Sequence, residues 1–284
     1  MKFKLINIVF AIFTFASIMN SCDIIEAPYE EDGGNQQIDT ASKVVLMEEY
    51  TGFRCGNCPT AGDIAHEIKA KYPDNVVLLS IHAGSLALPT PKHPYNFISQ
   101  VMKDLDAKYQ ISLAGTPNGL VDRISYNGAL ILPPGDWESA VLERTKIPAN
   151  VKITLTPSYN ETTKTISCSA AMKFLDDAPS SYQLALYVVE DSIVQYQTDY
   201  RLAPNVDVED FVHNNIVRDA LTNSFGEKIS DETISKGSEI IKQYSKTIPE
   251  TADWRPEWIR IVAVLMDVNN DYEVVQCGEK YILR

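Results

Sequence analysis

Two cysteines spaced C-x-x-C are the residues of this chain best suited to carry chemistry. Cys55 and Cys58 stand in the stretch "MEEYTGFRCGNCP", residues 47 to 59. A pair with this spacing can exchange a dithiol for a disulfide, supply half of a zinc site, or form two buried thiols. Thiol exchange requires a thiolate that is reachable and is a good nucleophile near ambient pH. The elements on either side of the pair decide among these alternatives.

The residues around the pair predict strands and helices in the order β-α-β-α-β-β-α. Buried strands are predicted over 43–50 and 75–81, with a helix between them whose apolar residues fall on one face. A second helix is predicted over 98–109 and a last one over 134–145. Between these two helices, Asn127-Gly128 predicts the tight turn of a hairpin. The β-α-β start requires two parallel strands with a right-handed crossover.

This order places Cys55 where the first strand gives way to a helix. The unpaired N–H groups at a helix start stabilise negative charge, and Arg54 adds a neighbouring cation. Both effects lower the pKa of the Cys55 thiol, so Cys55 is predicted to be the nucleophile. Cys58 follows one helical turn later and is predicted to be the more buried thiol, which attacks the mixed disulfide and releases the substrate.

Three features make residues 43–147 resemble a minimal thioredoxin fold. "CGNC" stands at the strand-to-helix junction, and "GTP" (115–117) precedes the third strand, where the family has a cis-proline loop facing the cysteines. Glu49 lies six residues before the first cysteine, where the family has a buried carboxylate. The resemblance implies that Glu49 accepts a proton and that Pro117 shapes the substrate groove. Arg54 and Asn57 depart from the family, which leaves the redox potential open.

The choice of Glu49 also agrees with strand geometry. Glu48 and Glu49 point to opposite faces of a strand, so only one of them can lie beneath the cysteines. A carboxylate buried under apolar strands has a raised pKa and can accept the proton of Cys58.

Cys55 and Cys58 allow two other interpretations, a zinc site and a static disulfide. A structural zinc site needs four ligands, and the chain has no second C-x-x-C and no close histidine pair, so we predict neither a metal nor another cofactor. A static disulfide in an inert scaffold stays open, because a fold does not determine a function.

The second half of the chain, 149–284, has a different pattern. It lacks strong helical stripes and is rich in strand-like segments separated by turn signals, which predicts an all-β sandwich, immunoglobulin-like in general shape. Residues 207–222 are ambiguous between a short helix and a long connection. Cys168 is predicted to point into the core, and Cys277 lies on a late strand. The two form a structural disulfide or remain two buried free thiols.

The first residues predict export. A short basic start and an apolar run end at Cys22, which resembles the lipoprotein signal of Gram-negative bacteria. We therefore predict a signal peptide over 1–21, a lipid on Cys22 and a flexible acidic tether over 22–42. An ordinary signal peptide is the alternative. Export places the four remaining cysteines in an oxidising compartment.

Length and net charge limit the number of domains and the classes of partner. The 284 residues allow two domains, predicted over 43–148 and 149–284. A net charge of −13 argues against nucleic acid, because phosphate contacts need clustered Lys and Arg. The oligomeric state is not predicted.

Taken together, the chain resembles the twenty-eight-kilodalton outer-membrane-protein family of Gram-negative anaerobes, partly through "YVVEDSIVQYQ" and "FVHNNIVRDAL". The resemblance implies an outer-membrane lipoprotein, discussed for the family as a surface adhesin or receptor. Our first hypothesis is a lipid-anchored thiol–disulfide oxidoreductase of the cell envelope, whose partners are thiols and disulfides of exported proteins. The alternative is a surface binding or adhesion lipoprotein that uses the thioredoxin-like unit as an inert scaffold.

Overall fold

The computed structural model describes residues 43–283. All of them fall within one compact unit. The predicted signal peptide, the lipid-bearing Cys22 and the predicted tether lie outside the described residues. Within the described range, no helix combines the length and the apolar character that crossing a membrane requires.

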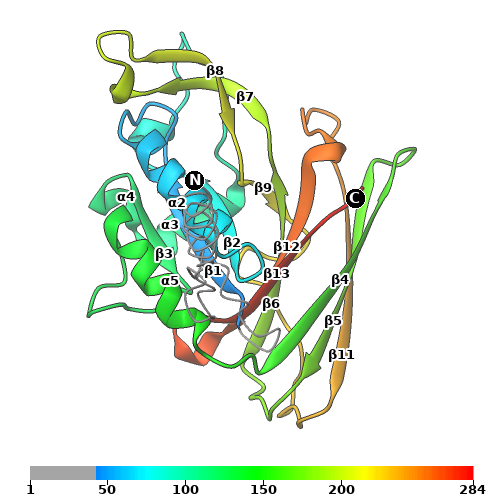
Figure 1. Ribbon diagram of the computed structural model, residues 1–284. Helices are drawn as coiled ribbons and strands as arrows, with labels where there is room; N and C mark the ends of the chain where they lie inside the picture. Colours follow the sequence, from blue (N-terminus) through cyan, green and yellow to red (C-terminus); the bar gives the residue numbers. More distant parts are fainter. Residues whose placement is uncertain (1–42, 284) are drawn as a thin grey trace, which may run out of the picture. The chain divides into compact units, whose positions relative to one another are not determined.

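The first half is built around two parallel strands. β1 (Val45–Thr51) and β2 (Val76–His82) pair in parallel and are joined by α2 (Cys58–Lys71), as the β-α-β pattern predicted (Figure 1). β3 (Asn118–Val121) pairs antiparallel with the other edge of β1. Every residue of β1 and β2 is buried, because helices cover both faces of this part of the sheet.

Helices divide between the two faces of the sheet. α2 and α5 (Trp137–Thr145) pack on one face, where Ala61, Ala65 and Trp137 meet Met47 of β1. α3 (Gln100–Tyr109) packs on the other face, and the single-turn α4 (Ile111–Ala114) follows it. Five short 3₁₀ turns complete the described helices: Ser85–Ala87, Pro134–Asp136, Tyr200–Leu202, Pro256–Trp258 and Val268–Asn270.

The hairpin predicted at Asn127-Gly128 forms only in part. Both residues have positive φ, 50° and 83°, as this kind of turn requires. The strand predicted after the turn is reduced to isolated bridges, Gly119 with Leu132 and Tyr126 with Ala129. The indole N–H of Trp137 donates to the Leu132 carbonyl at 2.9 Å, so α5 holds this segment in place of a longer ladder.

The sheet continues across the predicted domain boundary. Its strand order is β13-β12-β6-β9-β2-β1-β3, and β2 meets β9 where Ser80 pairs with Ile216. The added strands are β6 (Tyr182–Glu190), β9 (Ile216–Ala220), β12 (Ile259–Asp267) and β13 (Glu273–Tyr281), and the short β10 (Glu227–Lys228) pairs with β6. The two halves of the chain therefore share one sheet.

A second sheet faces this one. β4 (Val151–Asn160), β5 (Thr165–Phe174) and β11 (Glu239–Thr247) form it in the order β11-β5-β4. This sheet lies beside β6 and β12 of the larger one (Figure 1). Alternate residues of β5 are buried and pack against apolar residues of β6 and β12. The structure is thus a mixed α/β arrangement with many strands, and the immunoglobulin-like arrangement stays a prediction.

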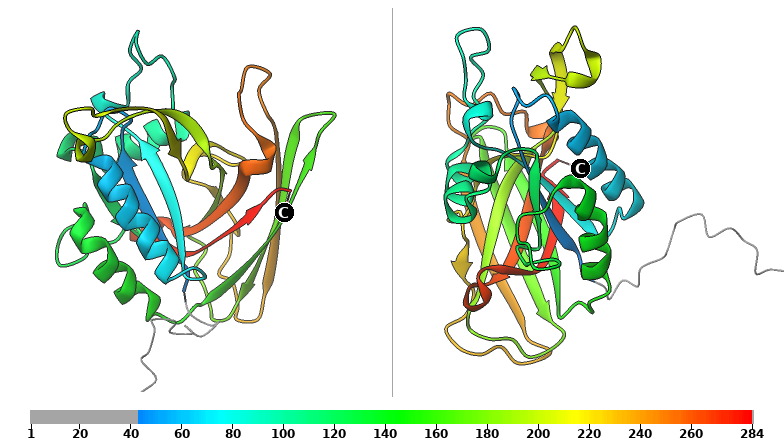
Figure 2. Two further views of the ribbon diagram at one scale, coloured as in Figure 1. Left: turned by 45° about the horizontal axis from the view of Figure 1, so that its top comes forward. Right: turned by 90° about the vertical axis from the view of Figure 1, so that its left-hand side faces the viewer.

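The ambiguous segment 207–222 contains two strands and no helix. One is β9, and the other, β8 (Asp207–His213), pairs with β7 (Ile193–Thr198) in a separate two-stranded sheet. We call residues 193–213 the β7–β8 hairpin. It lies near the end of β1 at which α2 begins (Figure 2). The sequence patterns predicted neither this hairpin nor its position.

Two buried arginines hold the shared sheet together. Arg123 donates to both carboxylate oxygens of Glu48, at 2.9 and 2.7 Å, and both side chains are essentially inaccessible to solvent. Arg260 of β12 donates to Asp191 at 2.6 Å and to the Leu78 carbonyl of β2 at 3.2 Å. Each of these two ion pairs lies within one half of the chain, and the hydrogen bond of Arg260 to the Leu78 carbonyl links the second half to the first.

Replacing Arg123 by Met should leave the Glu48 carboxylate buried without a partner. We expect the free energy of unfolding to fall by about 3–5 kcal/mol, because an uncompensated buried charge is strongly destabilising. Urea unfolding of Arg123→Met against the unmodified protein measures this. Lys71→Met is the matched control, since it breaks an exposed pair with Glu138 and should change stability far less. Equal losses in the two variants would contradict the role given to the Glu48–Arg123 pair.

Candidate functional site

Cys55 and Cys58 form a disulfide with an S–S distance of 2.08 Å. Cys58 is the first residue of α2, and Cys55 lies in the turn that leads into the helix. The turn is held by hydrogen bonds from the Cys55 N–H to the Gly52 carbonyl, 2.9 Å, and from the Cys58 N–H to the Cys55 carbonyl, 3.2 Å. No acidic residue lies in the first turn of α2, so no like charge there weakens the stabilisation that the helix N-terminus gives to a thiolate.

The predicted proline loop lies against the first cysteine. The Thr116–Pro117 peptide bond is cis, and the Cys55 Sγ lies 3.7 Å from the Thr116 carbonyl oxygen. β3 begins at the next residue and pairs with β1, the strand that precedes the cysteines. The antiparallel pairing of β1 with β3 is therefore what brings residues 61 positions apart into contact.

Glu49 lies on the face of β1 that α2 covers. It lines a cavity of about 60 Å³ together with Cys58, Pro59 and Gly62 of α2. Desolvation is the main cause that raises the pKa of Glu49 to about 7. The Ser80 hydroxyl, which donates to the carboxylate at 3.4 Å, lowers the pKa, and the nearby charge of Asp63 raises it. Glu48 points to the opposite face, as strand alternation requires.

Three histidines line this cavity, the exposed His66 of α2 and two buried ones that the motif analysis did not connect. His82 of β2 and His213 of β8 have ring centroids 5.6 Å apart, and His82 stacks on Phe97 at 4.2 Å. Burial lowers the pKa of His82 well below its usual value and lowers the pKa of His213 to about 4. Both rings are therefore neutral near pH 7. Among the described residues, neither ring nitrogen of His82 has a hydrogen-bond partner.

A signal for His82 was present in the sequence. Glu49 and Thr51 lie two apart on β1, and Ser80 and His82 lie two apart on β2. The parallel register pairs Glu49 with Ser80 and Thr51 with His82, so all four share one face. His213 reaches the cavity only through the β7–β8 hairpin, which the sequence pattern did not predict. Within residues 43–283, no three side chains of metal-binding type converge on one point.

The disulfide is covered, which corrects the expectation of a reachable Cys55. Each cysteine is only 3% exposed. The Thr198 N–H donates to the Phe53 carbonyl at 2.8 Å and the Tyr200 N–H donates to the Gly56 carbonyl at 2.9 Å. The physical reason is tertiary: the covering residues come from the β7–β8 hairpin, far along the chain.

Arg54 has a different partner from the one expected. Its guanidinium donates to the Ser85 carbonyl and lies 6.0 Å from the Phe53 ring centroid. The backbone N–H of Arg54 also donates to the Leu86 carbonyl, 3.1 Å away. These contacts join the cysteine loop to the segment after β2.

A disulfide between Cys168 and Cys277, one of two alternatives, does not form. Both are free and buried thiols, and they belong to different apolar clusters. Cys168 lies between the two facing sheets, whereas the Cys277 Sγ contacts the Val44 carbonyl at 3.2 Å beside β1. Desolvation raises the pKa of Cys168 to about 11 and that of Cys277 well above its usual value, so neither is a thiolate at neutral pH.

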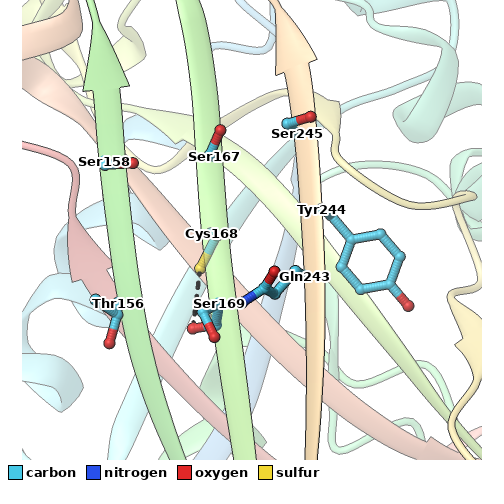
Figure 3. Close-up of a pocket in the computed structure, with 8 residues that line it drawn as sticks. All are labelled: Thr156, Ser158, Ser167, Cys168, Ser169, Gln243, Tyr244 and Ser245. Carbon is cyan, nitrogen blue, oxygen red and sulfur yellow. Dashed lines mark hydrogen bonds between the residues drawn. The ribbon is translucent and has the colours of Figure 1, made fainter.

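The outer side of the three-stranded sheet around Cys168 has a shallow depression of about 370 Å³ (Figure 3). Serine and threonine hydroxyls of β4 and β5 lie beside Gln243 and Ser245 of β11 (Figure 3). Hydroxyls and one amide can form hydrogen bonds, but they supply no acid or base for neutral pH. The chemistry is therefore concentrated at the Cys55–Cys58 disulfide.

Comparison with known proteins places the chain in a family. The family model "Outer membrane protein Omp28" matches residues 104–282, more than half of the chain. The chain belongs to this outer-membrane-protein family, which confirms the resemblance seen in the sequence. No curated protein matches significantly.

Two solved structures share the fold at low identity, and a third is similar to about half of the chain. HBP35 of Porphyromonas gingivalis is 16% identical, with a TM-score of 0.63 over 85% of this chain and 76% of that one. A protein of Agrobacterium tumefaciens is 14% identical, with a TM-score of 0.50 over 84% and 94%. A domain of the outer membrane lipoprotein Omp28 from Porphyromonas gingivalis is 16% identical, with a TM-score of 0.30 over 47% and 88%.

The raised pKa of Glu49 predicts a pH-dependent stability. Its carboxyl titrates near pH 7 when folded and near its ordinary value of 4.5 when unfolded. Between these values the folded state holds the extra proton, so the free energy of unfolding falls as pH rises, by on the order of 3 kcal/mol in total. Glu49→Gln should abolish this fall and be more stable than the unmodified protein above pH 7.

Urea unfolding at a series of pH values from about 4 to 8 measures both profiles. Glu67→Gln, which changes an exposed carboxylate of α2, is the control and should retain the original profile. If Glu49→Gln also retains that profile, the carboxyl does not titrate as described.

Proposed function

We propose that this protein is a thiol–disulfide oxidoreductase of the cell envelope that acts on exported proteins. The observation that carries the proposal is that Cys58 and the buried Glu49 line one cavity, with the Glu49 pKa raised to about 7. A carboxyl with this pKa can take a proton from a neighbouring thiol and give it back near neutral pH.

The order of elements supports the proposal. β1, α2, β2, α3, β3, the bridged hairpin and α5 follow one another as in a thioredoxin-like unit. The disulfide lies at the junction of the first strand with its helix, and the Pro117 loop lies against Cys55. Fold resemblance alone does not establish an activity, so the proposal depends on the site.

The reaction assigns a separate task to each residue. In the reduced protein, the Cys55 thiolate attacks a substrate disulfide, forms a mixed disulfide and releases one substrate thiolate. Glu49 then accepts the proton of the Cys58 thiol. The Cys58 thiolate attacks the Cys55 sulfur, which forms the observed Cys55–Cys58 disulfide and releases the second substrate thiolate. Read in reverse, the same steps oxidise a substrate dithiol.

The two buried histidines of the cavity do not compete with Glu49 for the proton of the Cys58 thiol. Burial lowers the pKa values of His82 and His213, so both rings stay neutral in the range where Glu49 titrates. Glu49 is thus a buried group of this cavity whose charge changes near neutral pH.

The cellular setting forms part of the proposal. The family name indicates an outer membrane protein. A lipid on Cys22 and the acidic segment 22–42 would hold the catalytic unit near the membrane while leaving it free to meet exported chains.

One observation favours a second candidate. Both cysteines are only 3% exposed beneath the β7–β8 hairpin, as those of a permanent structural disulfide would be. In that case the protein is a surface binding or adhesion lipoprotein, and the disulfide only strengthens its scaffold.

Trapping variants test the activity. Cys58→Ser should accumulate mixed disulfides with exported proteins, because Cys55 can attack but nothing resolves the product. Cys55→Ser should trap none.

Glu49→Gln should slow insulin reduction by on the order of a hundredfold, since general acid–base groups contribute at this scale. Non-reducing gels and insulin turbidity report the results, and equilibration with glutathione gives the direction of electron flow.

The inert-scaffold candidate predicts a different pattern. The reduced protein would then reduce insulin no faster than a Cys55→Ser, Cys58→Ser double variant, and Cys58→Ser would trap no partner. That pair of results would exclude the oxidoreductase.

A further inference from the structure

The β7–β8 hairpin lies on the cysteine loop as an extended chain lies on a binding surface. Thr198 and Tyr200, two residues apart, donate their backbone N–H groups to the Phe53 and Gly56 carbonyls. The side-chain amide of Gln197 donates to the Cys55 carbonyl at 3.0 Å. Three carbonyls of the loop that holds the disulfide therefore accept hydrogen bonds from one short segment, residues 197–200.

Gly56 shows how closely this segment approaches. A Cβ atom at Gly56 would lie 2.3 Å from the Tyr200 ring, so the ring packs directly on the residue that follows Cys55. The other side of Tyr200 is open, with 57% of the residue exposed. Tyr200 thus covers the disulfide loop without being part of a buried core.

The tip of the hairpin is held to α2 by charges at the surface. Arg201 pairs with Asp199 of the hairpin at 2.5 Å and with Asp63 of α2. Lys92 pairs with Asp207 of β8 at 3.0 Å, and both side chains are largely exposed. Exposed ion pairs contribute little to stability, so the hydrogen bonds of residues 197–200 hold the tip on the cysteine loop more than these charges do. Local opening then requires the exchange of these hydrogen bonds and not global unfolding.

We propose that the cysteine loop is a binding site for an extended polypeptide, which residues 197–200 occupy in this structure. Displacing the hairpin exposes the Cys55–Cys58 disulfide and frees the Phe53 and Gly56 carbonyls together, while the Cys55 carbonyl keeps its hydrogen bond from the Cys58 N–H. An extended chain offers backbone N–H groups at alternate positions and can replace the contacts of Thr198 and Tyr200. A small thiol cannot replace these two contacts. The substrate class is therefore an unfolded or extended segment of an exported protein, and this inference rests on the proposed oxidoreductase activity.

Opening of the hairpin is tested with charge variants in the full chain. Arg201→Glu removes the pairs with Asp63 and Asp199 and places a third carboxylate beside these two. We expect dithiothreitol to reduce the Cys55–Cys58 disulfide about tenfold faster than in the unmodified protein, measured by timed alkylation and mass spectrometry. Adding Asp63→Arg should partly restore the slow rate. Lys228→Glu breaks a remote exposed pair with Asp231 and should leave the rate unchanged.

The substrate class is tested in the Cys58→Ser background. Cys55 is offered either a disulfide-linked unstructured peptide or oxidised glutathione, and formation of the mixed disulfide is timed. With the Arg201→Glu change added, the rate with the peptide should rise by about tenfold relative to the rate with glutathione. Circular dichroism verifies the fold of each variant, and Tyr200→Ala provides a second way to uncover the loop if Arg201→Glu does not fold.

The outcomes separate this inference from the proposed function. If neither Arg201→Glu nor Tyr200→Ala accelerates reduction, the hairpin is a fixed cover and the inference is wrong. If opening accelerates glutathione and the peptide equally, the site is not one for extended chains. If opening favours the peptide but no exported protein is trapped or reduced, the binding site stands and the oxidoreductase proposal fails.

Discussion

The burial of two adjacent carboxylates on β1 is the constraint on which the rest of the structure depends. Glu48 and Glu49 point to opposite faces of a strand that helices cover on both sides. Arg123 compensates Glu48 with two hydrogen bonds, whereas Glu49 has only a weak contact from Ser80. Desolvation without a counter-charge raises the pKa of Glu49 to about 7. One strand therefore carries a structural ion pair on one face and a titratable group beneath the disulfide on the other.

The second half of the chain completes this site as well as extending the sheet. Arg260 of β12 donates to the Leu78 carbonyl of β2 and to Asp191, which follows β6. The β7–β8 hairpin begins just after Asp191, so the compensated charge lies at its base. The hairpin then reaches the cysteine loop and supplies His213 to the Glu49 cavity. The division at residues 148 and 149 follows a change of pattern along the chain, but the sheet and the site both cross it.

Much of the first half was predictable, because its signals are local. Hydrophobic runs predicted β1, α2, β2 and α3, and strand alternation separated Glu48 from Glu49. The positive φ values at Asn127 and Gly128 follow from their residue types, but the strand after them did not form. Residues 207–222 could not be assigned, because short strands at the edge of the structure derive their pairing from distant partners. Cys168 and Cys277 looked like a pair only while the separate clusters that contain them were unknown.

The sequence by itself determined the chemical groups and their local setting: a C-x-x-C at a strand-to-helix junction, a carboxylate six residues earlier and a proline before a strand. These relations follow from spacing along one or two elements, where backbone geometry controls which side chains share a face. Only the tertiary structure decided that the disulfide is covered, that His213 joins Glu49, and that the second half of the chain contributes to the site. Those facts depend on contacts between residues more than a hundred positions apart, such as that of Gln197 with Cys55, and no local pattern specifies such contacts.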